Sequence, residues 1–192
     1  MMKDEWCYWM NAFTREECES IIQAAKKLPE QSATIGQNSL PADSGFRRSI
    51  IRWVDPVVNP EFTWVYDKLW NINRTVNHSW FGFNITHLPP LQFTEYDESY
   101  MGEYKSHQDT FWLAENHRKL SMVLQLSHES EYEGGSLVLE NTTNNPSDGD
   151  MAAMRQQGTV TAFASFMFHR LTPVTRGKRY SLVAWFEGPP FQ

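Results

Sequence analysis

The chain has 192 residues, enough for one domain with a sizeable buried core, and its 14% of aromatic residues argues against disorder. Its 17 Lys and Arg against 23 Asp and Glu give a net charge of −6, which disfavours nucleic-acid binding because a phosphate backbone requires a basic protein face. It has no apolar stretch of membrane-spanning length, and Cys7 and Cys18 lack a metal-ligand spacing, so we expect reduced thiols, no membrane contact and a cytoplasmic location.

The N-terminal part has a largely helical pattern. Thr14-Arg15-Glu16-Glu17 has the form of a capping box, which predicts a helix over 14–27. The polar stretch 29–46 is expected to be a long loop, either a lid that orders when substrate binds or a tolerated surface insertion. A strand is expected over 49–54, and a long helix with a proline at its start over 60–78.

From Phe81 to Phe186 the pattern changes to short β-like runs separated by turns. Such a pattern predicts two antiparallel sheets rolled together, with the helices packed outside them. Within this part, Gly134-Gly135 is expected to form a turn or a close backbone contact before a strand over 136–140. The stretch 141–157 is expected to be a solvated connector.

The most informative motif is His107-Gln108-Asp109, which is followed much later in the chain by His169. Two imidazoles and one carboxylate form a ligand set for ferrous iron that leaves the opposite coordination positions open. On an extended backbone, residues two apart point to the same side, roughly 6.6 Å apart, so His107 and Asp109 could hold one ion together. The triplet has little weight on its own, because a His-x-Asp occurs by chance in many chains.

The C-terminal segment adds an anion-binding pattern. Arg179-Tyr180-Ser181 opens an apolar run, 182–186, with the composition of a buried strand. By period-two alternation, Arg179 and Ser181 share one face of this strand with the next two odd-numbered residues. A buried arginine requires an anionic partner, and its planar fork suits a carboxylate.

The order His-x-Asp, His and Arg-x-Ser resembles the iron(II)- and 2-oxoglutarate-dependent dioxygenases, above all their prolyl 4-hydroxylase-like branch. The similarity is densest over 91–189, about half of the chain, and ordered motifs carry it: Gln92 to Tyr96, Tyr104, Lys119 to Ser127, Tyr132 to Leu137, His169 to Val174 and Gly177 to Ser181. The resemblance implies a mainly β (α+β) fold, a double-stranded β-helix of the jelly-roll, cupin-like type with flanking N-terminal helices. We expect a single domain over 1–192, with helical support in 1–80 and the jelly-roll core in 81–189.

Carried over residue by residue, the resemblance implies three iron ligands and an anchor for the distal carboxylate of 2-oxoglutarate. The ligands are His107, Asp109 and His169, and the anchor is Arg179, with Ser181 as a further donor. The chain departs from many relatives in one respect, because they place the basic residue nine positions after the distal histidine, where this chain has Lys178. We favour Arg179, because it precedes Tyr180-Ser181 as the family's arginines do and because Lys178 would point to the opposite face.

Several other residues have two interpretations. Tyr96 and Tyr104 match tyrosines that line the co-substrate pocket in similar enzymes, but they could equally be half-buried strand residues. Gln125 could donate its amide to the same carboxylate. Arg47-Arg48-Ser49 could reach a substrate or pair with some of the excess acids. Four histidines lack ligand spacing and are expected to be surface or structural residues: His78, His87, His117 and His128.

The resemblance also implies the cofactors and the reaction. Fe(II) would bind 2-oxoglutarate as co-substrate, O2 would be the oxidant, and ascorbate could maintain activity. The reaction would release succinate and CO2 and return a hydroxyl group to the acceptor. We expect the acceptor to be a peptidyl side chain, with proline favoured, on a peptide or protein partner, and a small-molecule acceptor is the alternative within the family.

Two alternatives come from other classes. One is a non-catalytic metal-binding jelly roll that acts as a sensor or interaction module. The complete triad together with Arg179 argues against it, since binding alone requires neither an open metal face nor a carboxylate anchor. The other is a zinc hydrolase with the same ligands, but the sequence offers no candidate general base beside them.

Overall fold

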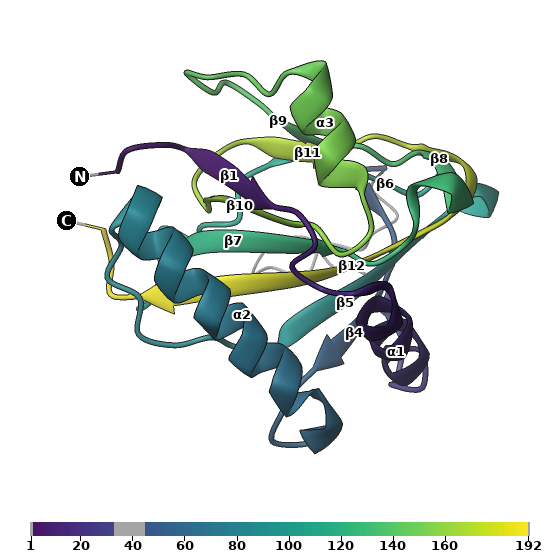
Figure 1. The fold of residues 1–192 in the computed structure, drawn as a ribbon, viewed down its shortest axis with the longest axis horizontal. Coiled ribbons are helices and arrows are strands. Elements are labelled where there is room, and N and C mark those ends of the chain that lie inside the picture. Colours follow the sequence, from purple (N-terminus) through teal and green to yellow (C-terminus); the bar gives the residue numbers. More distant parts are fainter. Residues whose placement is uncertain (1, 33–44, 192) are drawn as a thin grey trace.

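The computed structural model describes residues 2–32 and 45–191. Within these residues the strands form two antiparallel sheets, a larger one of eight strands and a smaller one of four. Strands of the larger sheet cross the centre of Figure 1, and β6, β9 and β11 of the smaller sheet lie above them. The two sheets form the jelly roll that the sequence predicts.

The larger sheet has the order β1-β10-β7-β12-β5-β4-β2, with β8 paired to β12. Its strands are β1 (Trp6–Trp9), β2 (Gln31–Ser32), β4 (Ile50–Val54), β5 (Leu91–Asp97), β7 (His117–Gln125), β8 (Tyr132–Gly134), β10 (Val160–Ala164) and β12 (Val174–Gly188). The smaller sheet has the order β3-β6-β11-β9, formed by β3 (Arg47–Arg48), β6 (Glu103–His107), β11 (His169–Leu171) and β9 (Leu137–Leu139). The long strand β12 pairs with β5 on one side and β7 on the other, so it lies at the centre of the larger sheet.

The side chains of β12 alternate between two environments. Leu182 and Phe186 point to one face and belong to the hydrophobic core. The opposite face lines a pocket between the two sheets with four side chains: Arg179, Ser181, Val183 and Trp185. The shared face that period two predicts for these residues is therefore confirmed.

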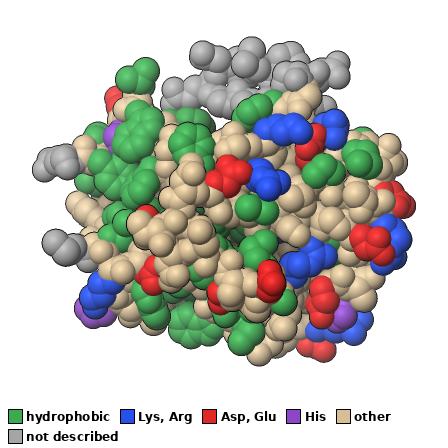
Figure 2. All heavy atoms as spheres, turned by 90° about the horizontal axis from the view of Figure 1, so that it is seen from above, with side chains coloured by type: hydrophobic (Ala, Val, Ile, Leu, Met, Phe, Trp, Pro, Cys, Tyr) green, Lys and Arg blue, Asp and Glu red, His purple; other side chains and the backbone are tan. Residues whose placement is uncertain are grey.

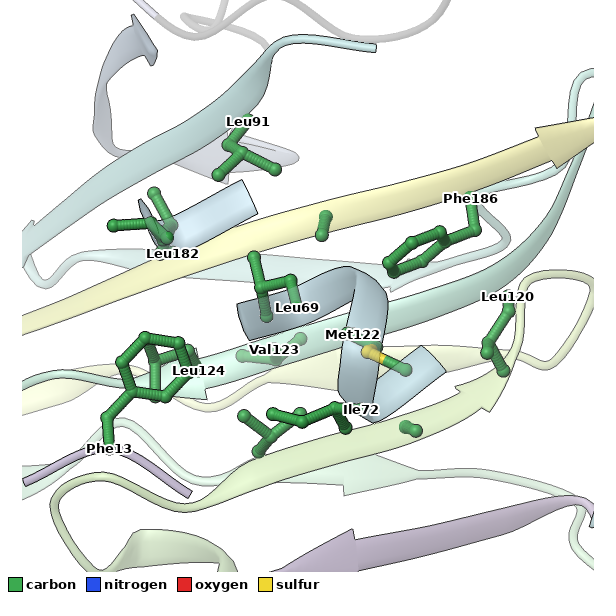
Figure 3. Close-up of a cluster of buried hydrophobic side chains, with 14 of the residues drawn as sticks. Phe13, Leu69, Ile72, Leu91, Leu120, Met122, Val123, Leu124, Leu182 and Phe186 are labelled. Carbon is green, nitrogen blue, oxygen red and sulfur yellow. The ribbon is translucent and has the colours of Figure 1, made fainter. Parts of the chain in front are cut away.

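Two helices, α1 (Arg15–Ala25) and α2 (Thr63–Val76), cover the outer face of the larger sheet (Figure 1). Leu69 and Ile72 of α2 lie over Met122 of β7 and over the apolar side chains of β12 (Figure 3). Each fully buried side chain of this size contributes about 1.5–3 kcal/mol of transfer free energy. This apolar layer holds the larger sheet in place, so that its other face can carry polar groups.

The start of α1 confirms the predicted capping box. The Glu17 N–H donates to the Thr14 hydroxyl at 3.2 Å, and the Thr14 N–H donates to the Glu17 carboxylate at 2.7 Å. The same carboxylate accepts a hydrogen bond of 2.6 Å from Lys68 of α2. Glu17 therefore both starts α1 and joins it to α2.

The expected helix over 60–78 is present but is not uniform. A 3-10 turn over Pro60–Phe62 precedes α2, and a π-helical turn over Asn77–Phe81 follows it. Gly82 then adopts a φ of 68°, and its N–H donates to the Asn77 carbonyl at 2.7 Å. Glycine takes this left-handed conformation without steric cost, which ends the helix.

Two expectations about local structure were wrong. The stretch 141–157 contains a helix, α3 (Asp148–Arg155), because Ser147 and Asp150 form a second capping box ahead of residues with good helix propensity. The N-terminal part is not helical throughout, since β1 precedes α1. The pairing of β1 with β10 supplies its backbone hydrogen bonds, and such long-range pairing overrides local propensity.

The expected loop over 29–46 is only partly covered by the described residues. Gln31–Ser32 form β2 against β4, and Phe46 directly precedes β3. The remainder, 33–44, lies outside the described residues. Its role as a lid therefore stays a prediction.

The surface above the smaller sheet carries mixed charges. Figure 2 shows this side, with Lys and Arg side chains beside Asp and Glu side chains. Ion pairs of the protein include the half-buried pair Arg170–Glu140 at 2.8 Å and the exposed pair Arg176–Glu133 at 2.7 Å. Among the helices of residues 2–32 and 45–191, none combines the length and the apolar character needed to cross a bilayer.

Candidate metal centre and its pocket

Three side chains at one end of the smaller sheet converge on one point. His107 is the last residue of β6, Asp109 follows two residues later, and His169 is the first residue of β11. The two histidines are cross-strand partners in the β6–β11 pair. One ligand atom from each of the three residues lies within 4.8 Å of the other two. The Asp109 carboxylate lies 3.6 Å from Nε2 of His107 and 3.5 Å from Nε2 of His169.

Hydrogen bonds to the backbone orient both imidazoles. Nδ1 of His107 lies 2.8 Å from the Lys105 carbonyl oxygen, and Nδ1 of His169 lies 3.1 Å from that of Met167. A carbonyl oxygen can only accept, so Nδ1 carries a proton, and Nε2, the nitrogen on the side of Asp109, is the one that can bind a metal. Metal-binding histidines use this arrangement.

Asp109 is buried and held from two sides. The Ser121 hydroxyl donates to its carboxylate at 2.7 Å, and the Asp109 N–H donates to the Ser165 carbonyl at 2.9 Å. Burial by itself raises the pKa of this carboxyl group, but His169 and His107 outweigh that effect and hold the pKa well below its usual range. Asp109 is therefore an anionic ligand with a fixed orientation.

The triad forms one wall of a pocket between the two sheets. Residues of both sheets line it, including Tyr104 and Leu171 from the smaller sheet and Val123 and Trp185 from the larger one. Asp109 is the only carboxylate among the described residues that line it. Pockets with apolar walls and a few placed polar groups are typical of small-ligand sites.

Arg179 lies buried on the other side of this pocket. Its Nη1 donates to the Ser181 hydroxyl at 3.3 Å, and its guanidinium carbon lies 5.8 Å from the centroid of the Tyr96 ring. Its Nε has no hydrogen-bond partner among the described residues. A buried guanidinium held only by neutral groups requires an anion, and a carboxylate suits its geometry.

Lys178, the alternative basic residue, faces away from the pocket. Its side chain is 52% exposed and pairs with Asp97 at 2.5 Å and with Glu95 at 3.3 Å. The register of β12 thus places Arg179 inside the pocket and its neighbour on the surface. This geometry favours Arg179 as the carboxylate anchor.

Of the remaining predicted site residues, two line this pocket and one does not. Tyr96 and Tyr104 both line the pocket, and burial raises the pKa of Tyr104 to about 12, so its hydroxyl keeps its proton. Gln125 does not line this pocket. Its amide donates to the Ser127 carbonyl at 2.9 Å, and it lines an adjoining cavity that Arg179 also borders. A role of Gln125 in binding the same carboxylate stays a prediction.

Arg47 and Arg48 have different surroundings, and only Arg48 matches the ion-pair interpretation. Arg48 pairs with Glu103 at 2.7 Å, so it joins one of the excess acids. Arg47 is buried and lines the pocket, where it donates to the Ser49 hydroxyl at 2.8 Å and to the Gln92 side-chain carbonyl at 2.7 Å. Neighbouring residues of one short strand thus point to opposite sides.

Sequence reasoning did not assign Ser121 or Gln92 to the site. Both lie on pocket-facing positions of their strands, with Ser121 opposite Trp185 and Gln92 opposite Val183. In the sequence, each of the two is a polar residue between apolar neighbours, and this pattern could have indicated a role in the site. The four other histidines have surface or structural surroundings, as expected: His78 is exposed, His87 pairs with Glu187, His117 bonds the Trp112 carbonyl and His128 bonds Ser130.

A jelly roll that holds two histidines and one carboxylate at the wall of a pocket defines a class of metalloprotein, in which the open face of the triad serves non-haem iron chemistry. The sequence profile of the 2OG-Fe(II) oxygenase superfamily matches residues 91–187, about half of the chain. The chain therefore belongs to the 2OG-Fe(II) oxygenase superfamily. This is a family of oxidoreductases, and its name states the iron and the 2-oxoglutarate that its members use.

Curated relatives are hydroxylases of one type. The PKHD-type hydroxylase of Idiomarina loihiensis is 31% identical over 84 residues, which cover 44% of this chain and 36% of the relative. That of Acidovorax ebreus is 33% identical over 104 residues, which cover 51% of this chain and 43% of the relative. The matched regions thus span less than half the length of these curated relatives.

Solved structures share the fold over most of the chain. A Trichoplax adhaerens prolyl hydroxylase, in complex with a hypoxia inducible factor peptide fragment, has a TM-score of 0.74 at 16% identity and covers 95% of this chain and 83% of its own. The viral collagen prolyl hydroxylase of Paramecium Bursaria Chlorella virus-1, in complex with 2OG, has a TM-score of 0.66 at 17% identity and covers 96% of both chains. These likenesses establish a fold like that of the prolyl hydroxylases.

The residues present fit both groups that the family name implies. The Nε2 atoms of His107 and His169 and the anionic carboxylate of Asp109 are donors of the kind that ferrous iron accepts. Arg179 and Ser181 offer N–H and O–H donors to a carboxylate across the same pocket. The donor set and the unsatisfied Nε of Arg179 therefore match a dicarboxylate bound between the metal and the guanidinium.

Proposed function

We propose that the protein is an Fe(II)- and 2-oxoglutarate-dependent dioxygenase that hydroxylates a peptidyl side chain, with proline favoured, and releases succinate and CO2. The observation that carries the proposal is the convergence of His107, Asp109 and His169 in one pocket with the buried guanidinium of Arg179. O2 would be the oxidant, and ascorbate would maintain the metal in its active state. Iron, when bound to the triad, supplies the redox chemistry of the reaction.

The residues of the chain would bind the metal and the co-substrate, orient both and exclude water. His107 and His169 present their Nε2 atoms because backbone carbonyls hold their Nδ1 protons. Asp109 adds a negative charge whose orientation Ser121 fixes. These contacts set the positions of the ligand atoms before the metal binds, which reduces the reorganisation that binding requires.

Arg179 and Ser181 would hold the distal carboxylate of the co-substrate by donating hydrogen bonds to it. The neutral hydroxyl of Tyr104 is a further donor at the pocket wall. Aromatic and aliphatic side chains make up much of the remaining wall, including Trp185 and Val183. Such a wall keeps water away and strengthens each electrostatic contact inside the pocket.

A peptide acceptor is supported by the solved structures that share the fold, which include prolyl hydroxylases and one complex with a peptide fragment. A small-molecule acceptor is the alternative. The two differ in what must enter the pocket, since a peptide offers one side chain to it and leaves the rest of its backbone outside.

The test is an assay of the purified protein with Fe(II), ascorbate and 2-oxoglutarate against two sets of acceptors, a panel of proline-containing peptides and a panel of small molecules such as free amino acids. We expect succinate and a peptide that gains one oxygen atom, and neither product with the Asp109→Ala variant. Succinate with modification of small molecules alone would shift the function to a small-molecule acceptor. Iron binding without succinate under every condition would support the non-catalytic binding module instead.

A further inference from the structure

A second buried cation lies in the pocket and has no role in the function proposed so far. Arg47 is only 4% exposed and lines the same pocket as the triad. A third arginine of the lining, Arg170, pairs with Glu140 at 2.8 Å and is thereby neutralised. Arg47 has no such carboxylate partner among the described residues, and Asp109 is the only carboxylate of the described lining.

Arg47 lies close to the metal ligands. It belongs to β3 of the smaller sheet and is the cross-strand partner of Tyr104 on β6. Its guanidinium carbon lies 4.4 Å from the centroid of the Tyr104 ring, and that ring stacks on the His107 ring with centroids 3.5 Å apart. A single aromatic ring therefore separates the guanidinium of Arg47 from the first metal ligand.

Neutral groups hold the guanidinium of Arg47 in one orientation. Nε donates to the Ser49 hydroxyl at 2.8 Å, and Nη2 donates to the Gln92 side-chain carbonyl at 2.7 Å. Neither partner carries a charge, so no described residue compensates the positive charge of Arg47, while the two hydrogen bonds fix the direction of its guanidinium. The N–H groups left over at Nη1 and Nη2 form a planar pair that suits two oxygen atoms of one group.

With iron and 2-oxoglutarate bound, one formal charge in the pocket would have no opposite charge to balance it. Asp109 and a doubly charged 2-oxoglutarate are balanced by Fe(II) and Arg179. Among the described residues, Arg47 would then remain as a buried positive charge without a counterion. Burying an isolated charge is costly, so a ligand that brings a negative charge next to Arg47 is favoured over a neutral one of the same shape.

We propose that the acceptor substrate carries a carboxylate that binds Arg47 while the carbon to be hydroxylated lies at the metal centre. This inference rests on the proposed function and names the chemistry of its acceptor. The carboxylate can come from a free amino acid, from the C-terminus of a peptide or from an acidic side chain next to the target residue. All three present the same planar pair of oxygen atoms.

The test compares acceptors in pairs that differ only in this charge. The pairs are free L-proline and L-prolinamide, a peptide with C-terminal proline as the acid and as the amide, and an internal proline next to Asp or next to Asn. Succinate and oxygen incorporation are measured for each. We expect the acid of at least one pair to exceed its neutral partner by about 10- to 100-fold in kcat/KM, and the pair that shows this identifies the source of the carboxylate.

Variants of Arg47 distinguish a role in binding the acceptor's carboxylate from a purely structural role. We expect Arg47→Gln to raise the KM for the preferred acid by about 10- to 100-fold and to change the KM for its neutral partner and for the co-substrate much less. Arg47→Lys should retain part of the preference because it retains the charge. Arg48→Gln is the matched control, since Arg48 points to the surface and pairs with Glu103.

Two results would overturn the proposal in distinguishable ways. Equal turnover of acid and amide in every pair, or an equal loss for both in Arg47→Gln, would give Arg47 a structural role and leave the dioxygenase function standing. No succinate in any arm with the unaltered protein, although iron binds, would remove the proposed function itself.

Discussion

The Ser121 hydroxyl donates a 2.7 Å hydrogen bond to the Asp109 carboxylate. Ser121 belongs to β7 of the larger sheet, whereas Asp109 directly follows β6 of the smaller sheet. The same hydroxyl lies 2.9 Å from that of Ser165. The orientation of the anionic ligand thus depends on how the two sheets pack together.

We predict that Ser121→Ala weakens metal binding without unfolding the protein. Groups that orient metal ligands typically change affinity by about 10- to 100-fold, and we expect about 10-fold here. Anaerobic titration with Fe(II), or with Mn(II) as a redox-stable substitute, measures the change. Ser20→Ala, at an exposed position of α1, serves as the control. Equal metal affinity in both variants would show that Asp109 is held adequately without Ser121.

Arg179→Gln is expected to impair co-substrate binding but not metal binding. A charge-assisted hydrogen bond contributes about 1.5–3 kcal/mol, so we expect the KM for the co-substrate to rise by about 10- to 150-fold. Metal affinity should stay the same, because Arg179 does not contact the triad. Lys178→Gln is the matched control, and a larger effect from this variant would assign the anchor to Lys178.

The ion pair of Lys178 and Asp97 should make a small, pH-dependent contribution to stability. Burial raises the pKa of Asp97, but the hydrogen bond from Lys178, the hydrogen bonds from Ser99 and the charge of Lys178 together outweigh it, so the net shift is downward from 3.8. The same hydrogen bond raises the pKa of Lys178 above 10.5. The contribution is therefore full between these two values, fades as the pH falls below 3.8, and fades again as it rises above 10.5.

We expect Lys178→Met to lower the free energy of unfolding at pH 7 by about 0–1 kcal/mol, because the lysine is half exposed and solvent screens the pair. At pH 3 the difference between the variant and the unaltered protein should be smaller. Urea unfolding at both pH values provides the measurement. A difference that grew toward acidic pH would contradict the sign derived above.

The apolar layer under the larger sheet predicts a large effect of one core substitution. Leu69 of α2 is 1% exposed, so Leu69→Ala should lower the free energy of unfolding by about 2–5 kcal/mol through lost burial and the cavity left behind. Leu113→Ala makes the same chemical change at a side chain that is 98% exposed, and should cost little. Equal effects in urea unfolding would contradict the placement of α2 against the sheet.

Both cysteines should react slowly in the folded protein. Burial raises the pKa of the Cys7 and Cys18 thiols to about 12, and both are free. At pH 8 each thiol is therefore almost entirely protonated, and the thiolate is the reactive form. We expect iodoacetamide to label both residues rapidly in denaturant and slowly without it, as measured by mass spectrometry. Rapid labelling of native Cys18 would indicate that α1 opens readily.

Local patterns predicted those parts of the molecule that depend on neighbouring residues. The capping box at Thr14 starts α1, and period two places Arg179 and Ser181 on one face of β12. The same patterns did not lead to α3 or to β1. The second capping box at Ser147 was legible in the sequence, whereas the pairing of β1 with β10 requires a partner far along the chain.

The site shows the same division. The sequence supplied the candidate ligands and the choice of Arg179 over Lys178, because alternation along a strand is a local property. It could not decide between the two interpretations of Arg47 and Arg48, since each depends on what lies across the sheet. It also could not show that the amide of Gln125 turns to the Ser127 carbonyl.

By itself, the sequence determined which groups are available and which face of its strand each one occupies, because the backbone geometry of a strand fixes the direction of every second side chain. Only the tertiary structure decided that His169 lies opposite His107, that Ser121 reaches Asp109 and that Arg47 enters the same pocket. Those relationships depend on strand register and on the packing of two sheets, which arise from contacts between residues far apart in the chain.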